Sequence, residues 1–192
     1  MTIKEIIKSL ENDERNRRYT EAGIPPVFQV NEKAKILIIG QAPGKKVEET
    51  LIPFNDKSGE TLREWLGIDK DTFYSESIAI LPMDFYYPGK GKTGDLPPRS
   101  FIAKEYHSEL LAKMPGIELT ILIGRYSMEY YLKDRMERNL TETVRNFNKY
   151  LPEFFPIVHP SPLNGRWLAK NPWFKLEVIP CLQDNIARIL EK

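Results

Sequence analysis

The sequence predicts an α/β protein: a three-layer α/β/α sandwich around a central, mostly parallel four-stranded sheet. The predicted strands are four short apolar runs bounded by Gly, Pro or polar residues, at 35–39, 77–81, 119–123 and 154–158. Segments with helical patterning separate these runs. Strands that alternate with helices favour a parallel sheet covered by helices on both faces.

The first element is an amphipathic helix over residues 3–19, because three isoleucines and Leu10 recur there at helical spacing. The proline pair at 25–26 ends this region before the first strand. We therefore interpret residues 1–30 as an N-terminal helical extension of a single domain that covers 1–192.

The later helices are indicated by their ends. Ser58 is placed to cap a helix that runs to about Leu66, where Gly67 closes it. Further helices are expected over 100–114, 125–133 and 139–149, and from Pro172 to about Leu190 with a kink or restart at Pro180. Residues 82–99 form a long irregular connection, which in a compact domain is usually functional or mobile.

Composition agrees with one core, since 192 residues with 41% hydrophobic side chains suffice to build it. No apolar run reaches the roughly 18 residues of a membrane span, and the amphipathic amino terminus is unlike a signal peptide. Cys181 is the single cysteine, which excludes an internal disulfide and a four-cysteine zinc or iron–sulfur site. We expect a cytoplasmic monomer with no metal and no other cofactor.

Two loops that follow predicted strands carry the most informative residues. Residues 40–44, Gly-Gln-Ala-Pro-Gly, follow the strand 35–39, and residues 159–164, His-Pro-Ser-Pro-Leu-Asn, follow the strand 154–158. Loops at the carboxyl ends of parallel strands meet in one crevice, where ligands usually bind. The sequence therefore predicts a composite site that holds a carboxamide and an imidazole.

These loops resemble the two signature motifs of the uracil-DNA glycosylase superfamily. Residues 40–44 resemble the water-activating loop, written G-E-A-P-G in the iron–sulfur branch and G-Q-D-P-Y in the commonest branch. Residues 159–162 resemble the H-P-S-P start of the leucine loop, and residues 53–59 match the stretch P-F-x-x-x-[SA]-G. The resemblance spans roughly 33–190. It implies the superfamily's α/β fold and cleavage of the bond between a flipped, deaminated base and its sugar.

The resemblance also implies how the base is held. His159 corresponds to the histidine that steadies the departing base, and a neutral imidazole can donate a hydrogen bond to the developing oxyanion. Phe54 corresponds to the ring that stacks under the base, and Gly40 and Ala42 lie in the base-binding loop. A structural histidine and an ordinary core phenylalanine are the alternatives.

The water-activating position departs from the family pattern. Gln41 stands where the iron–sulfur branch has Glu, and Ala42 stands where the commonest branch has Asp. A carboxamide can orient water but cannot accept its proton, and general-base catalysis contributes about 10²–10⁴ in rate. We place Gln41 with His159 as the catalytic pair, and Glu48 and Asp84 as candidate substitute acids.

Base recognition departs from the pattern as well. The family often places an Asn at the end of its second core strand, where alignment puts Ala79 or an immediate neighbour. A site that hydrogen-bonds its ligand strongly rejects analogues that lack the matching groups. Without this Asn we expect relaxed or altered base choice.

Several residues could contact DNA. Leu163 resembles the wedge that fills the vacated base stack, the alternative being a buried leucine. A formal net charge of +1 is not the footprint of a strong DNA binder, but basic residues cluster after both loops and in 82–99. The candidate DNA contacts are Lys45, Lys46, Lys90, Lys92, Ser161, Leu163, Asn164 and Arg166, and Arg99 could join the same basic face; scattered surface charges are the alternative. The aromatic residues 85–87 could stack on unpaired bases or pack onto the core.

Two classes of function remain open. The first is a DNA glycosylase of base excision repair, a hydrolase acting on N-glycosyl bonds with DNA as its partner. The second is a catalytically weak or inactive relative that binds nucleic acid or a nucleobase-like ligand. A metabolic enzyme acting on a small nucleobase compound is a third interpretation.

Overall fold

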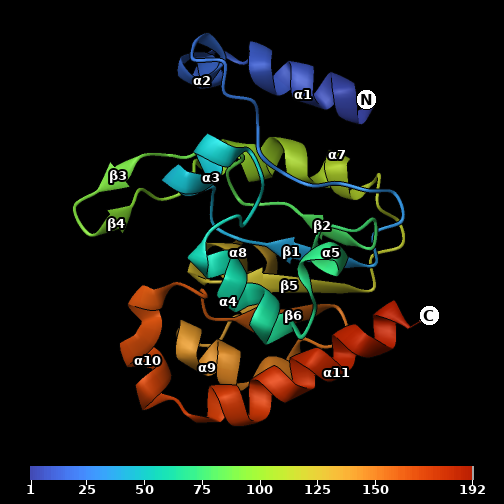
Figure 1. Ribbon diagram of the computed structural model, residues 1–192, viewed down its shortest axis with the longest axis vertical. Helices are drawn as coiled ribbons and strands as arrows, with labels where there is room; N and C mark the ends of the chain where they lie inside the picture. Colours follow the sequence, from blue (N-terminus) through green and yellow to red (C-terminus); the bar gives the residue numbers. More distant parts are fainter. Residues whose placement is uncertain (192) are drawn as a thin grey trace.

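The computed structural model describes residues 1–191, and a parallel four-stranded sheet forms its centre (Figure 1). The strands are β1 (Ile36–Ile39), β2 (Ile78–Ile80), β5 (Leu119–Ile123) and β6 (Phe154–Ile157). They lie in the order β2-β1-β5-β6, and every neighbouring pair is parallel. This confirms the predicted fold class, and each strand ends within one residue of its predicted bounds.

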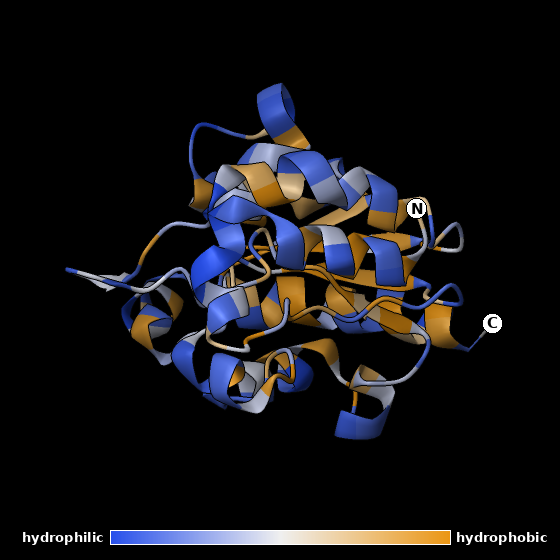
Figure 2. Ribbon diagram, turned by 90° about the horizontal axis from the view of Figure 1, so that it is seen from above, coloured by the Kyte–Doolittle hydropathy of each residue, from blue (hydrophilic) through white to orange (hydrophobic). Residues whose placement is uncertain are grey.

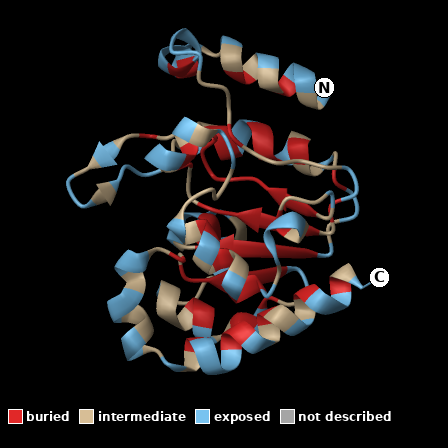
Figure 3. Cartoon of the chain, in the orientation of Figure 1, coloured by how far each residue is buried: buried red, intermediate tan, exposed pale blue. Residues whose placement is uncertain are grey.

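Helices cover both faces of the sheet (Figure 2). Right-handed crossovers place α4 (Lys57–Leu66), which follows β1, on one face, and the helices between β2 and β6 on the other. The long helix α11 (Ile179–Leu190) packs against α4. All four strands are buried along their length, whereas the outward faces of the helices are exposed (Figure 3).

The remaining elements surround this framework. The other α-helices are α1 (Ile3–Asn12), α2 (Arg17–Glu21), α3 (Lys45–Thr50), α5 (Lys70–Phe73), α6 (Ser100–Ile102), α7 (Ser108–Leu111), α8 (Arg125–Leu132), α9 (Leu140–Arg145) and α10 (Gly165–Lys170). The 3₁₀ turns are η1 (Glu14–Asn16), η3 (Lys133–Arg135), η4 (Phe147–Lys149) and η5 (Pro162–Asn164), and the π-helical turns are η2 (Ala103–His107) and η6 (Phe174–Val178). Among residues 1–191, no helix has the length and apolar character to cross a membrane.

Four predicted helices differ from the structure in their ends, and one of them is the helix expected over 139–149, where α9 ends at Arg145. The continuous helix over 3–19 is wrong, because the Asp13 carboxylate caps η1 and α1 ends one residue earlier. The helix expected over 100–114 contains the π turn η2 and ends at Leu111. Helix α4 is capped by Asp56 rather than Ser58: Asp56 Oδ1 accepts from the Gly59 amide at 2.9 Å. The closure of α4 by Gly67 in the left-handed region is confirmed.

The connection 82–99 contains a hairpin that sequence patterning did not predict. Its strands are β3 (Lys90–Gly91) and β4 (Gly94–Asp95), and the hairpin projects from the body beside α3 (Figure 1). Gly89 and Gly94 both have positive φ, 111° and 107°, which only glycine adopts readily. An isolated hairpin this short is marginal by itself, so its contacts with the body hold it in place.

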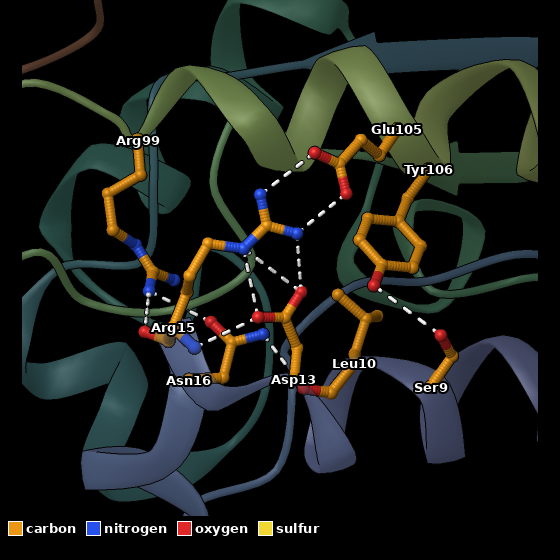
Figure 4. Close-up of polar contacts among 8 residues, drawn as sticks. All are labelled: Ser9, Leu10, Asp13, Arg15, Asn16, Arg99, Glu105 and Tyr106. Atoms are coloured by element: carbon orange, nitrogen blue, oxygen red, sulfur yellow. Dashed lines mark hydrogen bonds and ion pairs between the residues drawn. The ribbon is translucent and has the colours of Figure 1, made fainter.

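The N-terminal helices are fastened to the body by a polar network (Figure 4). The Arg15 guanidinium lies between the carboxylates of Asp13 and Glu105, at 2.6 and 2.7 Å, and over the ring of Phe101. Beneath this network, Leu10 is fully buried. The extension therefore packs onto the segment formed by α6 and η2.

Candidate functional site

A cavity of about 360 Å³ lies at the carboxyl ends of the strands. Helix α3, the β3–β4 hairpin and α10 lie at this end of the sheet (Figure 1). The cavity is lined by Val27 and Val47, and by residues from five further segments: 40–44, 53–58, 80–82, 93–95 and 159–164. The two predicted loops therefore meet in one cavity, together with the segment that carries Phe54.

His159 presents a defined hydrogen-bond donor at the cavity. The Ser161 amide donates to its Nδ1 at 3.2 Å, and the Asn164 side chain donates to its carbonyl oxygen at 2.8 Å. Because Nδ1 accepts, the proton of the neutral imidazole is on Nε2, which has no hydrogen-bond partner among residues 1–191. Burial lowers the pKa of His159, although the nearby carboxylates of Asp56 and Asp95 oppose this shift. The side chain is therefore neutral at pH 7 and offers a free N–H.

Phe54 is held in a strained but tightly supported backbone conformation. Its φ of 55° is in the left-handed region, which costs roughly 1–3 kcal/mol for such a residue. Gly59 makes this conformation accessible, because a Cβ there would lie 1.7 Å from the Phe54 carbonyl oxygen. The Phe54 ring packs edge-to-face on Phe73 at 6.3 Å, and a Cβ on Gly40 would lie 3.0 Å from its Cζ. The ring is thus fixed against the first loop, in the cavity wall.

The Gln41 side chain is oriented by the segment that follows the hairpin. Its Nε2 donates to the Leu96 carbonyl oxygen at 3.2 Å, which leaves Oε1 as an acceptor. The segment that follows β2 holds the backbone of the loop. The Met83 amide donates to the Gly40 carbonyl oxygen at 2.9 Å, and the Asp84 amide donates to the Gln41 carbonyl oxygen at 3.1 Å. Gly40, Gln41 and Ala42 all line the cavity.

Neither candidate substitute acid lines the cavity, and both predictions need correction. The Asp84 carboxylate is fully buried and pairs with the Arg99 guanidinium at 2.8 Å. Glu48 pairs with Lys45 Nζ at 2.8 Å. Because Arg99 is partly buried and pairs with Asp84, it is not part of an exposed basic face, and that prediction is wrong.

Two other carboxylates line the cavity instead, Asp56 and Asp95. Asp56 uses Oδ1 to cap α4, and Asp95 accepts from the Tyr87 hydroxyl at 3.2 Å. The sequence holds one signal for Asp56, because it precedes a predicted helix within the stretch 53–59, although the pattern there favours Ser58 as the cap. No sequence signal distinguishes Asp95 from other surface acids.

Ala79 does not line the cavity, because it is fully buried within β2. Its neighbour Ile80 and the following Pro82 form the wall at this point. The end of β2 therefore offers apolar side chains to the cavity rather than the amide that the sequence resemblance implies.

The rim of the cavity carries an exposed apolar side chain. Leu163, on η5, lines the cavity and is 85% exposed, so the alternative of a buried leucine is wrong. Ser161 and Asn164 line the cavity as well. The predicted basic contacts do not line it and are exposed on α3, the hairpin and α10: Lys45, Lys46, Lys90, Lys92 and Arg166. Phe85 and Tyr86 are buried, which confirms that they pack onto the core.

Comparison with known proteins places the chain in a family. The model of the uracil DNA glycosylase superfamily matches residues 27–183. Among solved structures, the chain is similar to a solution NMR structure of a candidate uracil DNA glycosylase from Methanosarcina acetivorans. The two are 17% identical, the match covers 83% of this chain and 98% of that chain, and the TM-score is 0.47.

Proposed function

Because the chain belongs to the uracil DNA glycosylase superfamily, we propose that it is a DNA glycosylase that hydrolyses the bond between a deaminated base, uracil or a related base, and its sugar. The observation that carries the proposal is that His159, Phe54 and Gln41 line one cavity while Leu163 stands exposed at its rim. The volume of about 360 Å³ is in the range of roughly 300–1,000 Å³ typical of small-molecule sites.

In this proposal the base enters the cavity by leaving the DNA stack. Flipping a nucleotide costs a few kcal/mol of stacking and pairing, and an inserted apolar side chain fills the gap that remains. Leu163 is suited to this task because its side chain is already exposed at the rim of the cavity. Phe54 then supplies a flat ring on which the flipped base stacks.

His159 stabilises the departing base. As the glycosidic bond breaks, negative charge develops on the base oxygens, and the Nε2–H donates to one of them. A neutral donor preorganised in this way is the kind of group that stabilises a developing oxyanion. The Ser161 amide on Nδ1 keeps the imidazole in the required tautomer.

Hydrolysis needs a hydrogen-bond acceptor for the attacking water and a negative charge near the cationic sugar. Gln41 Oε1 can accept a hydrogen bond from the water, because the amide nitrogen is engaged by Leu96. We assign the charge to Asp56, the half-buried carboxylate of the cavity wall, which can stabilise the cationic sugar and take the proton from water. The hydroxyl of this water becomes part of the abasic sugar, and the base leaves with a proton.

One observation favours the second candidate, an inactive relative that binds nucleic acid or a nucleobase-like ligand. The loop after β1 carries neutral Gln41, and the candidate acids Glu48 and Asp84 are held in ion pairs and do not line the cavity. Binding needs the cavity, the stacking ring and the wedge but not a carboxylate.

Release of the base distinguishes the two functions. Labelled oligonucleotides with one uracil, hypoxanthine or xanthine, single-stranded or opposite guanine, are incubated with protein in EDTA and cleaved at abasic sites by alkali. We expect release by the wild type and a loss of about 10²-fold or more in His159→Ala. Release that persists in His159→Ala contradicts the assignment. Tight DNA binding with no release from any substrate establishes the binding function.

A further inference from the structure

We propose that His107 is a positioning residue: by holding the Pro82 carbonyl it fixes the segment 82–84, which in turn fixes the backbone of the loop that carries Gln41. The catalytic part of this inference depends on the proposed function. The structural part does not, since it concerns only the hydrogen bonds that hold the loop.

His107 is buried and uses both ring nitrogens. Nε2 lies 2.9 Å from the Pro82 carbonyl oxygen, and Nδ1 lies 2.7 Å from the Tyr131 hydroxyl. A carbonyl can only accept, so Nε2 carries the proton and Nδ1 accepts from Tyr131. Burial lowers the pKa of His107 to about 4, which keeps the ring neutral at pH 7. The ring also stacks on Phe85 at 5.7 Å, so its position is fixed by three neighbours.

The local backbone explains how His107 reaches Pro82. It is the last residue of the π turn η2, where the helix is wider by one residue per hydrogen-bonded turn. Turns of this kind inside α-helices occur frequently at functional sites. Here the turn directs a polar side chain from the helical layer to the end of β2.

The segment 82–84 connects His107 to the site residue by residue. Pro82 accepts from His107 and lines the cavity, Met83 donates to the Gly40 carbonyl at 2.9 Å, and Asp84 donates to the Gln41 carbonyl at 3.1 Å. Two successive carbonyls of the water-activating loop therefore receive their hydrogen bonds from this segment. A shift of Pro82 would move the donors for both.

The other end of the segment is held from a different direction. The Asp84 carboxylate pairs with Arg99, whose Nη1 donates to Asn16 Oδ1 at 2.8 Å and to the Arg15 carbonyl at 3.1 Å. Figure 4 shows Arg99 beside these N-terminal residues. His107 thus holds the Pro82 end while Arg99 and the N-terminal turn hold the Asp84 end.

The test compares three variants. His107→Leu fills most of the space but removes the donor to Pro82, and His107→Gln can restore a donor. Tyr131→Phe removes only the bond at Nδ1 and is the matched control for loss of a buried polar contact. For each variant, hydrogen exchange is measured at the amides of Met83 and Asp84 and at those of strands β5 and β6, together with kcat and KM for uracil release from single-stranded DNA.

We expect His107→Leu to speed exchange at Met83 and Asp84 at least tenfold while β5 and β6 keep their protection. In that variant kcat should fall about 10- to 100-fold, as expected for a misplaced reacting group, with KM within threefold. His107→Gln should recover both properties, and Tyr131→Phe should change them little. Unchanged exchange at Met83 and Asp84 in folded His107→Leu overturns the inference, as does an equal effect of Tyr131→Phe.

Failure of the proposed function is a separate result. A wild type that releases no base refutes the glycosylase, but the exchange data still decide whether His107 positions the loop. Should His107→Leu fail to fold, exchange is measured in His107→Ala, which also lacks a donor to Pro82. Selective loss of protection at Met83 and Asp84 in that variant supports the inference, and wild-type protection there overturns it.

Discussion

Replacing Gly59 by alanine tests how the stacking ring is supported. A Cβ at this position would lie 1.7 Å from the Phe54 carbonyl oxygen, well inside the 3.0 Å that real contacts require. Either the start of α4 or the backbone of Phe54 has to move by about an ångström. Overpacking in a well-packed region costs about 1–3 kcal/mol and occasionally more, and here the obstructing atom is backbone. We expect Gly59→Ala to lose about 3 kcal/mol, the upper part of that range.

The assay combines urea unfolding, thermal unfolding and base release. A loss of about 3 kcal/mol in a chain of this size lowers Tm by about 6–12 °C. Gly165→Ala in α10 is the matched control, because nothing lies within 4 Å of its added Cβ and its free energy of unfolding should stay within about 1 kcal/mol of the wild type. Release by folded Gly59→Ala should fall at least tenfold. A Gly59→Ala protein with wild-type stability and release refutes the close-approach reasoning.

Three further predictions follow from single contacts. Asp56→Asn keeps the cap of α4 but removes the charge, so the rate of base release should fall about 10²-fold at unchanged Tm. The control is Asp69→Asn, which changes the equivalent cap of α5 and should leave base release unchanged. Similar release by the two variants contradicts the assignment of Asp56. Leu163→Ala should slow release from duplex DNA about tenfold and spare single-stranded DNA, and an equal loss on both would exclude a wedge. The pKa of His107 is about 4 in the folded protein, so as pH falls from 6.5 to 4 its imidazole becomes protonated in the unfolded chain first. Over this range the free energy of unfolding of the wild type, measured in urea, should fall by about 3 kcal/mol more than that of His107→Gln. An equal fall in the two proteins would contradict this prediction.

The sheet was predictable because its strands are continuous apolar runs between breakers. Burial on both faces of a parallel sheet requires such runs, so their ends could be read within one residue. The helix ends were less predictable. Several side chains near a boundary can cap, and the choice of Asp56 over Ser58 depends on where the chain enters α4. The π turn η2 depends on tertiary contacts, among them those of His107 with Pro82 and Tyr131. The pattern of neighbouring residues in the sequence does not predict such contacts.

The candidate site was predictable where it lies directly after a strand. Gln41 and His159 follow β1 and β6, and parallel strands bring such loops together. The acids were not predictable in this way. Asp84 also follows a strand, four residues beyond the end of β2, but its partner Arg99 lies 15 residues further on and holds the carboxylate away from the cavity. Asp95 lines the cavity because it lies on a short hairpin at the edge of the site, and that hairpin left no hydrophobic pattern in the sequence.

A crystal structure with a uracil base and an abasic strand bound tests the central claim most directly. The quantity to measure is the distance from His159 Nε2 to the nearest oxygen of the base. We expect a hydrogen bond of about 2.7–3.2 Å, with the base stacked on Phe54 and Leu163 inserted in the strand. A base bound outside this cavity, or inside it with His159 Nε2 directed away from every base oxygen, would contradict the glycosylase mechanism.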